Sequence, residues 1–174
     1  RSTLFPYTTL FRSRTGVREW LEAHRPQRAR LGLIHNDPKL DNCQFDPQNP
    51  DRIKSVFDWE MTTIGPTLVD LGTLLAYWAE AGAQVSDQAV SALSIFAKPG
   101  FPSRDEIMHY YAMKSGTALD DIRWYEIFAT WKSAVIAQQV YARFARGQTQ
   151  DQRFASMGGR VPEMLAAALR RIEQ

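Results

Sequence analysis

Four polar residues in the first third of the chain have the types and the spacing that phosphoryl transfer requires. His35, Asp37 and Asn42 form the pattern H-x-D-x-x-x-x-N, and Asp58 follows sixteen residues after Asn42. Phosphoryl transfer needs a carboxylate that orients the attacking hydroxyl and accepts its proton, together with oxygen ligands that hold Mg²⁺ on the phosphates. Asp37 suits the first task. Asn42 and Asp58 suit the second, because Mg²⁺ prefers hard oxygen ligands and retains several waters.

Two apolar runs, residues 31–34 and 53–57, precede these polar residues and predict the strands that position them. Short apolar runs bounded by turn residues are typical of buried strands. Aspartate, asparagine and proline between residues 46 and 51 predict a turn. We therefore expect the two strands to pair with each other, which would bring the polar residues together.

The segments IHNDPKLDN, FDWE and GPTLVDLGTLLAYW resemble the aminoglycoside phosphotransferase family, in the branch that is fused to acyl-CoA dehydrogenases. The resemblance covers residues 17–174. It implies the C-terminal lobe of a protein-kinase-like fold, which is α+β and mainly α-helical, with a short β-hairpin that carries the catalytic and metal loops. It also implies that Asp37 is the catalytic base and that His35 braces its loop. Asn42 and Asp58 match the ligands that bind Mg²⁺ and, through it, the nucleotide.

One position departs from the family pattern, and others have more than one interpretation. Asn36 stands where the family usually has glycine, and asparagine is among the few residues that tolerate a left-handed backbone. Asp70 matches an aspartate whose role in the family is structural. Lys39 could contact phosphate or substrate, but a lysine that points into solvent is the commoner case.

The elements that clamp a nucleotide in kinases are not found before the catalytic motif. These elements are a glycine-rich phosphate loop, a strand lysine and its glutamate partner. Gly16 and Gly32 are isolated, and Lys39 is the first lysine of the chain. We therefore expect a fragment that lacks the N-terminal lobe and is inactive alone. Residues 1–13 contain two near-copies of Thr-Leu-Phe and are interpreted as a foreign, adapter-like segment, with an edge hairpin as the alternative, so the predicted domain covers 14–174.

Apolar residues at helical spacing predict helices in the segments 17–24, 68–80, 86–96, 103–115, 120–147 and from 161 onwards. Ser103 and Glu106 form a capping box at the start of the fourth of these, and Gly116 is expected to end it. The polar segment 151–160 contains two adjacent glycines and is expected to be a mobile linker.

The composition limits the class of protein. A chain of 174 residues with 44% hydrophobic residues can form one globular domain with a sizeable core. The formal charge of +2 is too small to indicate nucleic-acid binding. Cys43 is the single cysteine, which excludes an internal disulfide and a cysteine-based zinc site. Charges or glycines interrupt every apolar run, so we expect no membrane span and a cytoplasmic enzyme.

Three functions compete. The first is a kinase-like phosphotransferase that uses ATP or another nucleoside triphosphate with Mg²⁺ and phosphorylates a hydroxyl of a small molecule. The resemblance suggests a hydroxyacyl-CoA as acceptor and an acyl-CoA dehydrogenase as partner or fusion. The second is a pseudokinase or binding module, which the retention of Asp37, Asn42 and Asp58 opposes. The third is a metal-dependent hydrolase that uses His35, Asp37 and Asp58, but it lacks the second histidine or bridging carboxylate that a catalytic two-metal site needs.

Overall fold

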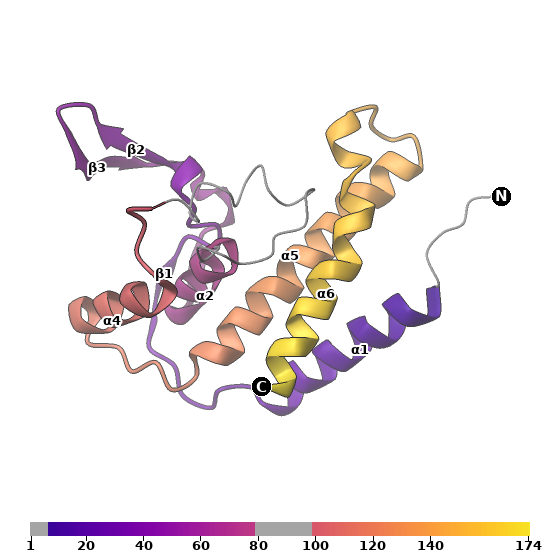
Figure 1. Ribbon diagram of the computed structural model, residues 1–174, viewed down its shortest axis with the longest axis horizontal. Helices are drawn as coiled ribbons and strands as arrows, with labels where there is room; N and C mark the ends of the chain where they lie inside the picture. The colour runs from indigo at the N-terminus through magenta and orange to yellow at the C-terminus, as the bar shows by residue number, and fades with distance from the viewer. Residues whose placement is uncertain (1–6, 79–98) are drawn as a thin grey trace.

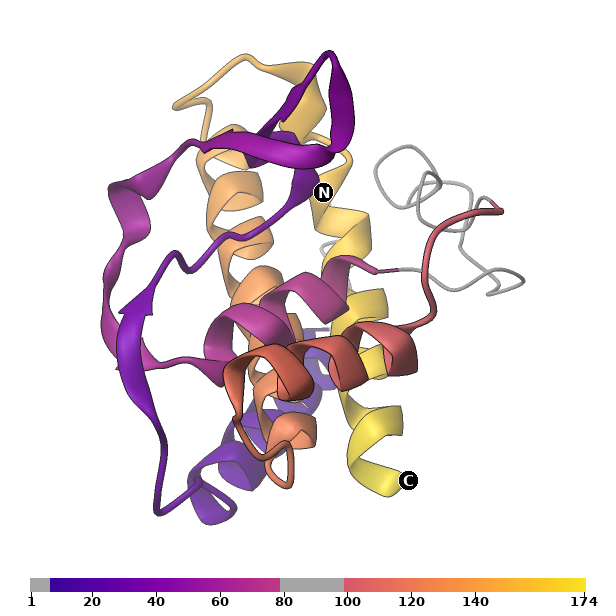
Figure 2. The same ribbon diagram turned by 90° about the vertical axis from the view of Figure 1, so that its left-hand side faces the viewer.

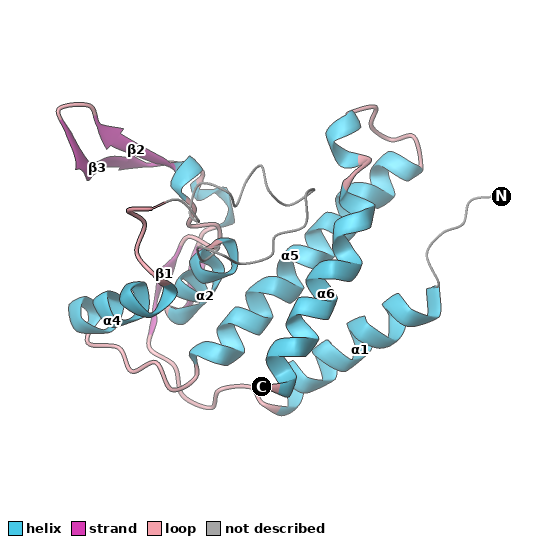
Figure 3. Ribbon diagram, in the orientation of Figure 1, coloured by secondary structure: helices cyan, strands magenta, loops and turns pink. Residues whose placement is uncertain are grey.

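The longest helix of the described residues is α5 (Ile122–Ala145), and other helices pack around it. The computed structural model describes residues 7–78 and 99–174. α6 (Met157–Glu173) runs antiparallel beside α5, and α1 (Tyr7–Ala23) packs against both (Figure 1). Apolar side chains from these three helices form buried clusters that include Val17, Leu21, Ile127, Leu165 and Ala168. The mainly helical α+β class that the sequence predicts is confirmed (Figure 3).

A second helical layer, α2 (Leu68–Tyr77) and α4 (Arg104–Ser115), lies beside the first half of α5. α2 approaches α5 closely because Gly72 faces its backbone. A Cβ atom at Gly72 would lie 2.7 Å from the carbonyl group of Tyr125, closer than real Cβ contacts allow. The absence of a side chain at Gly72 therefore permits the close approach of α2 to α5.

The strands form two separate antiparallel pairs, and the predicted pairing is wrong. β1 (Leu31–Ile34) pairs with β4 (Thr63–Pro66), whereas β3 (Asn49–Val56) pairs with β2 (Cys43–Asp46) across the predicted turn. The second pair is a hairpin that projects from the helical body (Figure 1). β2 is short and mixes polar with apolar residues, so it has no strand pattern that would identify it as the partner of β3.

The prediction that these strands are buried is also wrong for most of their side chains. Alternate residues of a strand point to opposite faces, and only one face of the β1–β4 pair meets the helices. Ile34 is 4% exposed, whereas Leu31 and Leu33 are 65% and 63% exposed, as is Ile64 on β4 at 67%. Val56 and Phe57 are exposed as well.

The capping signals of α4 and the extent of α5 agree with the sequence. The Ser103 hydroxyl accepts a hydrogen bond from the Glu106 backbone N–H at 3.2 Å, and the Glu106 carboxylate accepts one from the Ser103 N–H at 2.7 Å. Gly116 ends the helix with a left-handed backbone, at φ of 65°. α5 lies inside the predicted segment 120–147.

The start of α1 and the end of α2 differ from the prediction. α1 begins at Tyr7 and not at residue 17, so its backbone is helical where the alternative interpretation placed a hairpin; the assignment of 1–13 as foreign stays a prediction. α2 ends at Tyr77, because Trp78 has an extended backbone. The predicted helix at 86–96 lies outside the described residues. None of the helices in the described ranges is long and apolar enough to cross a membrane.

The segment 151–160 is not a linker. It contains the short helix Gln152–Phe154, which the Asp151 carboxylate caps, and the first turn of α6. A Cβ atom at Gly158 would lie 2.8 Å from the Tyr141 ring of α5. This glycine therefore permits close packing of α6 on α5, which is a different use of glycine from the flexibility that the sequence analysis assumed.

Candidate active site

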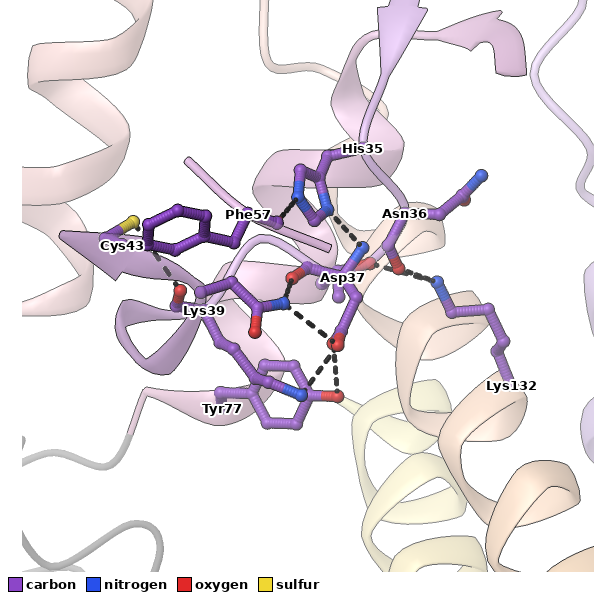
Figure 4. A network of polar contacts seen from close by, with 10 residues as sticks. His35, Asn36, Asp37, Lys39, Cys43, Phe57, Tyr77 and Lys132 are labelled. Carbon is purple, nitrogen blue, oxygen red and sulfur yellow. Dashed lines mark hydrogen bonds and ion pairs between the residues drawn. The ribbon is translucent and has the colours of Figure 1, made fainter. Parts of the chain in front are cut away.

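His35 follows β1 and supports the loop with both ring nitrogens. Nε2 lies 2.7 Å from the Phe57 carbonyl oxygen, to which it donates, and Nδ1 accepts from the Asp37 N–H at 3.3 Å (Figure 4). The side chain is 4% exposed, and its ring lies 4.7 Å from that of Trp59, centroid to centroid. His35 thus joins the loop of Asp37 to the end of β3.

Asn36 has the left-handed backbone that the sequence analysis considered tolerable, with φ of 70°. Three contacts hold it there. Its N–H donates to the Asp70 carboxylate at 2.8 Å, its side-chain amide donates to the Met61 carbonyl at 2.8 Å, and its own carbonyl accepts from Lys132 Nζ at 2.7 Å. The second oxygen of Asp70 accepts from the His35 N–H at 2.7 Å. Asp70 therefore has the structural role that the resemblance implied.

The carboxylate of Asp37 is held by side chains from three directions and is 18% exposed. Oδ2 accepts from Lys39 Nζ at 2.6 Å and from the Asn42 amide at 3.3 Å, and Oδ1 accepts from the Tyr77 hydroxyl at 3.0 Å (Figure 4). The interpretation of Lys39 as a solvent-pointing lysine is wrong, since its ammonium pairs with Asp37. Each oxygen of a carboxylate can accept about two hydrogen bonds, so among the described residues Oδ1 keeps one acceptor position.

Asn42 lies in the short helix Leu40–Asn42 and is 8% exposed. The Asn42 amide nitrogen donates to the backbone carbonyl of Asp37 at 3.0 Å and also to the Asp37 carboxylate. Since the nitrogen is used in this way, the side-chain carbonyl oxygen is the atom left to bind a cation. Cys43, the next residue, begins β2 and is half-buried, and burial raises the pKa of its thiol.

Asp58 is brought to the same region by the hairpin. Cys43 pairs with Val56, and the N–H of Phe57 donates to the Asn42 carbonyl at 2.8 Å, so Asp58 directly follows a residue bonded to Asn42. The pairing of β2 with β3, and not β1, therefore brings the backbone next to Asp58 to that of Asn42. Asp58 is exposed, has a left-handed backbone with φ of 67°, and makes no capping hydrogen bond to the helix Trp59–Met61.

Two residues that the sequence analysis missed, Tyr77 and Lys132, complete the site. Burial, and then the charge and hydrogen bond of Asp37, raise the pKa of Tyr77 to about 12, against a smaller opposing effect of Ser133. Burial lowers the pKa of Lys132, which Asp37 and Asp70 partly offset by their negative charges. The sequence contains one signal for Tyr77. Tyr77 lies seven residues after Asp70 on an otherwise apolar helix, and residues seven apart lie on one helical face.

The donor set fits a magnesium ion that is shared with a phosphorylated ligand. One amide oxygen, from Asn42, and one exposed carboxylate, from Asp58, are hard ligands of the kind that Mg²⁺ takes together with phosphates and waters. No cluster of three or more His, Cys, Asp or Glu residues that could hold a metal by itself occurs in 7–78 and 99–174. The hydrolase hypothesis is disfavoured, because both nitrogens of His35 are engaged in hydrogen bonds and Nε2 carries a proton.

Comparison with known proteins supports a kinase-like phosphotransferase family. The model of the Phosphotransferase enzyme family, APH, matches residues 3–107, more than half of the chain. Acyl-CoA dehydrogenase family member 10 of Mus musculus is 30% identical over 154 residues, and family member 11 of Homo sapiens is 32% identical over 139 residues. These alignments cover 85% and 77% of this chain but 14% and 17% of the relatives.

A solved structure has the same fold. It is the crystal structure of a Ralstonia eutropha protein assigned as an aminoglycoside phosphotransferase, with a TM-score of 0.76 and 24% identity. The superposition covers 93% of this chain and 49% of that chain. The helical architecture is therefore one part of a larger kinase-like fold. By the family match, the chain belongs to the Phosphotransferase enzyme family, as the resemblance in its sequence predicted.

Proposed function

We propose that this chain carries the catalytic and metal loops of a kinase-like phosphotransferase, which transfers the terminal phosphoryl group of ATP to a hydroxyl of a small molecule. The observation that supports this most is the convergence of Asp37 and Asn42 in one loop, with Asp58 attached to it through the Phe57–Asn42 hydrogen bond. A base and two oxygen ligands are the protein groups that phosphoryl transfer needs at this position.

In the proposed reaction the acceptor hydroxyl donates a hydrogen bond to Asp37 at the remaining acceptor position of Oδ1. The hydroxyl oxygen attacks the terminal phosphorus, the bond from that phosphorus to the bridging oxygen breaks, and ADP leaves. Asp37 takes the hydroxyl proton and later releases it to solvent. Asn42 and Asp58 would hold Mg²⁺, which when bound neutralises charge on the phosphates.

The relatives give a direction for the acceptor. Both are named as acyl-CoA dehydrogenase family members, so a hydroxyacyl-CoA is the first acceptor to test, with an acyl-CoA dehydrogenase as fusion or partner. The site itself carries two lysines, Lys39 and Lys132, within its hydrogen-bond network. An anionic acceptor or donor is compatible with these charges.

The test is calorimetric binding of ATP with and without Mg²⁺, to this chain and to the same chain joined to an N-terminal kinase lobe. Binding that depends on Mg²⁺, followed by ADP release with a hydroxyacyl-CoA as acceptor, would support the proposal. Asp58→Asn should weaken the Mg²⁺ dependence, and Asp51→Asn, in the exposed hairpin, is the matched control. Absence of binding in both forms would favour a binding module without catalysis.

A further inference from the structure

We propose that Tyr77 is a positioning residue for phosphoryl transfer, which fixes the orientation of the Asp37 carboxylate. The inference rests on the proposed function. The Tyr77 hydroxyl donates to Asp37 Oδ1 at 3.0 Å from a position forty residues later in the chain. With Lys39 on Oδ2 at 2.6 Å, both carboxylate oxygens are held, and rotation about the Cβ–Cγ bond of Asp37 would break one contact or the other.

The helix that carries Tyr77 contacts the catalytic loop at both of its ends. Asp70, in the first turn of α2, binds the loop backbone at His35 and Asn36, and Tyr77, in the last turn, binds the Asp37 side chain. A spacing of seven residues is close to two helical turns, so both side chains project from the same face. Thr73 lies between them on this face, 3.5 Å from Lys132 Nζ.

The C-terminal end of α2 is itself held in place, which a positioning residue requires. The Arg104 guanidinium donates to the carbonyl oxygens of Leu75 and Trp78 and pairs with Glu126 on α5. The Trp78 indole donates to the Pro102 carbonyl at 2.8 Å. Tyr77 is therefore attached to a fixed helix end, and its hydroxyl can determine where Asp37 points.

Tyr77 acts on Asp37 as a donor. Its pKa of about 12 keeps the phenol protonated at neutral pH, so the hydroxyl donates to the carboxylate and does not itself accept the proton of an acceptor hydroxyl. The remaining acceptor position on Oδ1 lies next to this hydrogen bond. Loss of the phenol oxygen should then change how well Asp37 is oriented, without changing the groups that bind the nucleotide.

The test uses Tyr77→Phe in the form of the protein that shows turnover of MgATP, with Tyr110→Phe on the exposed face of α4 as the matched control. We expect Tyr77→Phe to lower kcat about tenfold, as loss of one hydrogen bond to a charged group would, with an unchanged KM for MgATP and an unchanged melting temperature. In an Asp37→Asn background the same substitution should cause no further loss, because Tyr77 acts through Asp37.

The outcomes separate this inference from the proposed function. If no form turns over MgATP, or if Asp37→Asn is fully active, the proposed function fails and this inference with it. If Asp37→Asn is inactive but Tyr77→Phe is as active as Tyr110→Phe, only the positioning role of Tyr77 is wrong. A loss of kcat that comes with a raised KM and a lowered melting temperature would show that Tyr77 is merely a structural residue. A loss that persists undiminished in the Asp37→Asn background would show the same.

Discussion

The proposed catalytic and metal-binding aspartates, Asp37 and Asp58, are held in different ways. Asp37 is 18% exposed and is contacted by side chains from its own loop and from α2. Asp58 is exposed, and the contacts around it hold its neighbours. The Phe57 and Met61 carbonyls accept hydrogen bonds from the first loop, which carries Asp37, and the Trp59 indole donates to the Val56 carbonyl at 2.7 Å. The Asp37 carboxylate is thus held by side-chain contacts, whereas the Asp58 side chain faces solvent.

This difference indicates which of the two carboxylates is already oriented before ligands bind. A carboxylate that is already oriented loses little freedom when substrate binds, which is the benefit of preorganisation. A solvent-facing carboxylate can take its final orientation when a ligand binds. We expect this of a metal ligand that is shared with phosphates. Figure 1 shows the hairpin of β2 and β3 extending away from α2 and α5, and Figure 2 shows α2 and α4 crossing in front of α5.

The largest effect should come from the prearranged loop. We expect Asp37→Asn to lower turnover of MgATP by about a thousandfold, within the range known for a general base, with nucleotide binding nearly unchanged. Asp58→Asn should weaken Mg²⁺-dependent binding instead, so the two substitutions should differ in kcat and in KM. Steady-state kinetics at several Mg²⁺ concentrations would measure both. Equal behaviour of the two variants would contradict the comparison.

The tertiary support of the first loop should be visible in stability. Asp70→Ala removes the acceptor of two backbone N–H groups, those of His35 and Asn36, and should lower the free energy of unfolding by about 3 kcal/mol. Asp51→Ala, on the exposed hairpin, should change it by less than about 0.5 kcal/mol. Urea denaturation of both variants is the measurement. A small effect of Asp70→Ala would show that the loop keeps its structure without the hydrogen bonds to Asp70.

The burial of Tyr77, together with its contact with Asp37, should also make stability depend on pH in the alkaline range. The pKa of Tyr77 is raised from 10.0 to about 12 in the fold. A raised pKa stabilises the fold fully below pH 10 and loses that contribution as pH rises through about 12, a change of about 2 kcal/mol. Tyr77→Phe should flatten this loss relative to the parent, whereas Tyr110→Phe should retain it. Unfolding free energies at pH 9 and pH 12 would decide.

The smallest effects should come from the two left-handed residues, Asn36 and Asp58. Asp58→Gly should stabilise the chain by about 0.5 kcal/mol, because glycine adopts this backbone without steric cost and no capping hydrogen bond is lost. Asn36→Gly should gain as much from the backbone but lose the hydrogen bond to Met61, so we expect no net stabilisation. Thermal denaturation would compare them, and a stabilising Asn36→Gly would contradict the importance of that contact.

The sequence predicted local structure well where the signal was complete within a few residues. The capping box of Ser103 and Glu106 and the left-handed end at Gly116 were correct, because each depends on the backbone within one turn. The strand pairing was wrong, because pairing depends on which segments meet after the helices pack. The short strand Cys43–Asp46 has too little pattern of its own to be recognised.

The sequence by itself determined the chemical groups of the site and their order, since His35, Asp37, Asn42 and Asp58 stand at a recognisable spacing. Only the tertiary structure decided that Tyr77 and Lys132 join them, from forty and ninety-six residues beyond the residues that they contact. The physical reason is the packing of α2 on α5. The missing side chain at Gly72 lets the two helices approach, and this brings distant polar groups to the loop of Asp37.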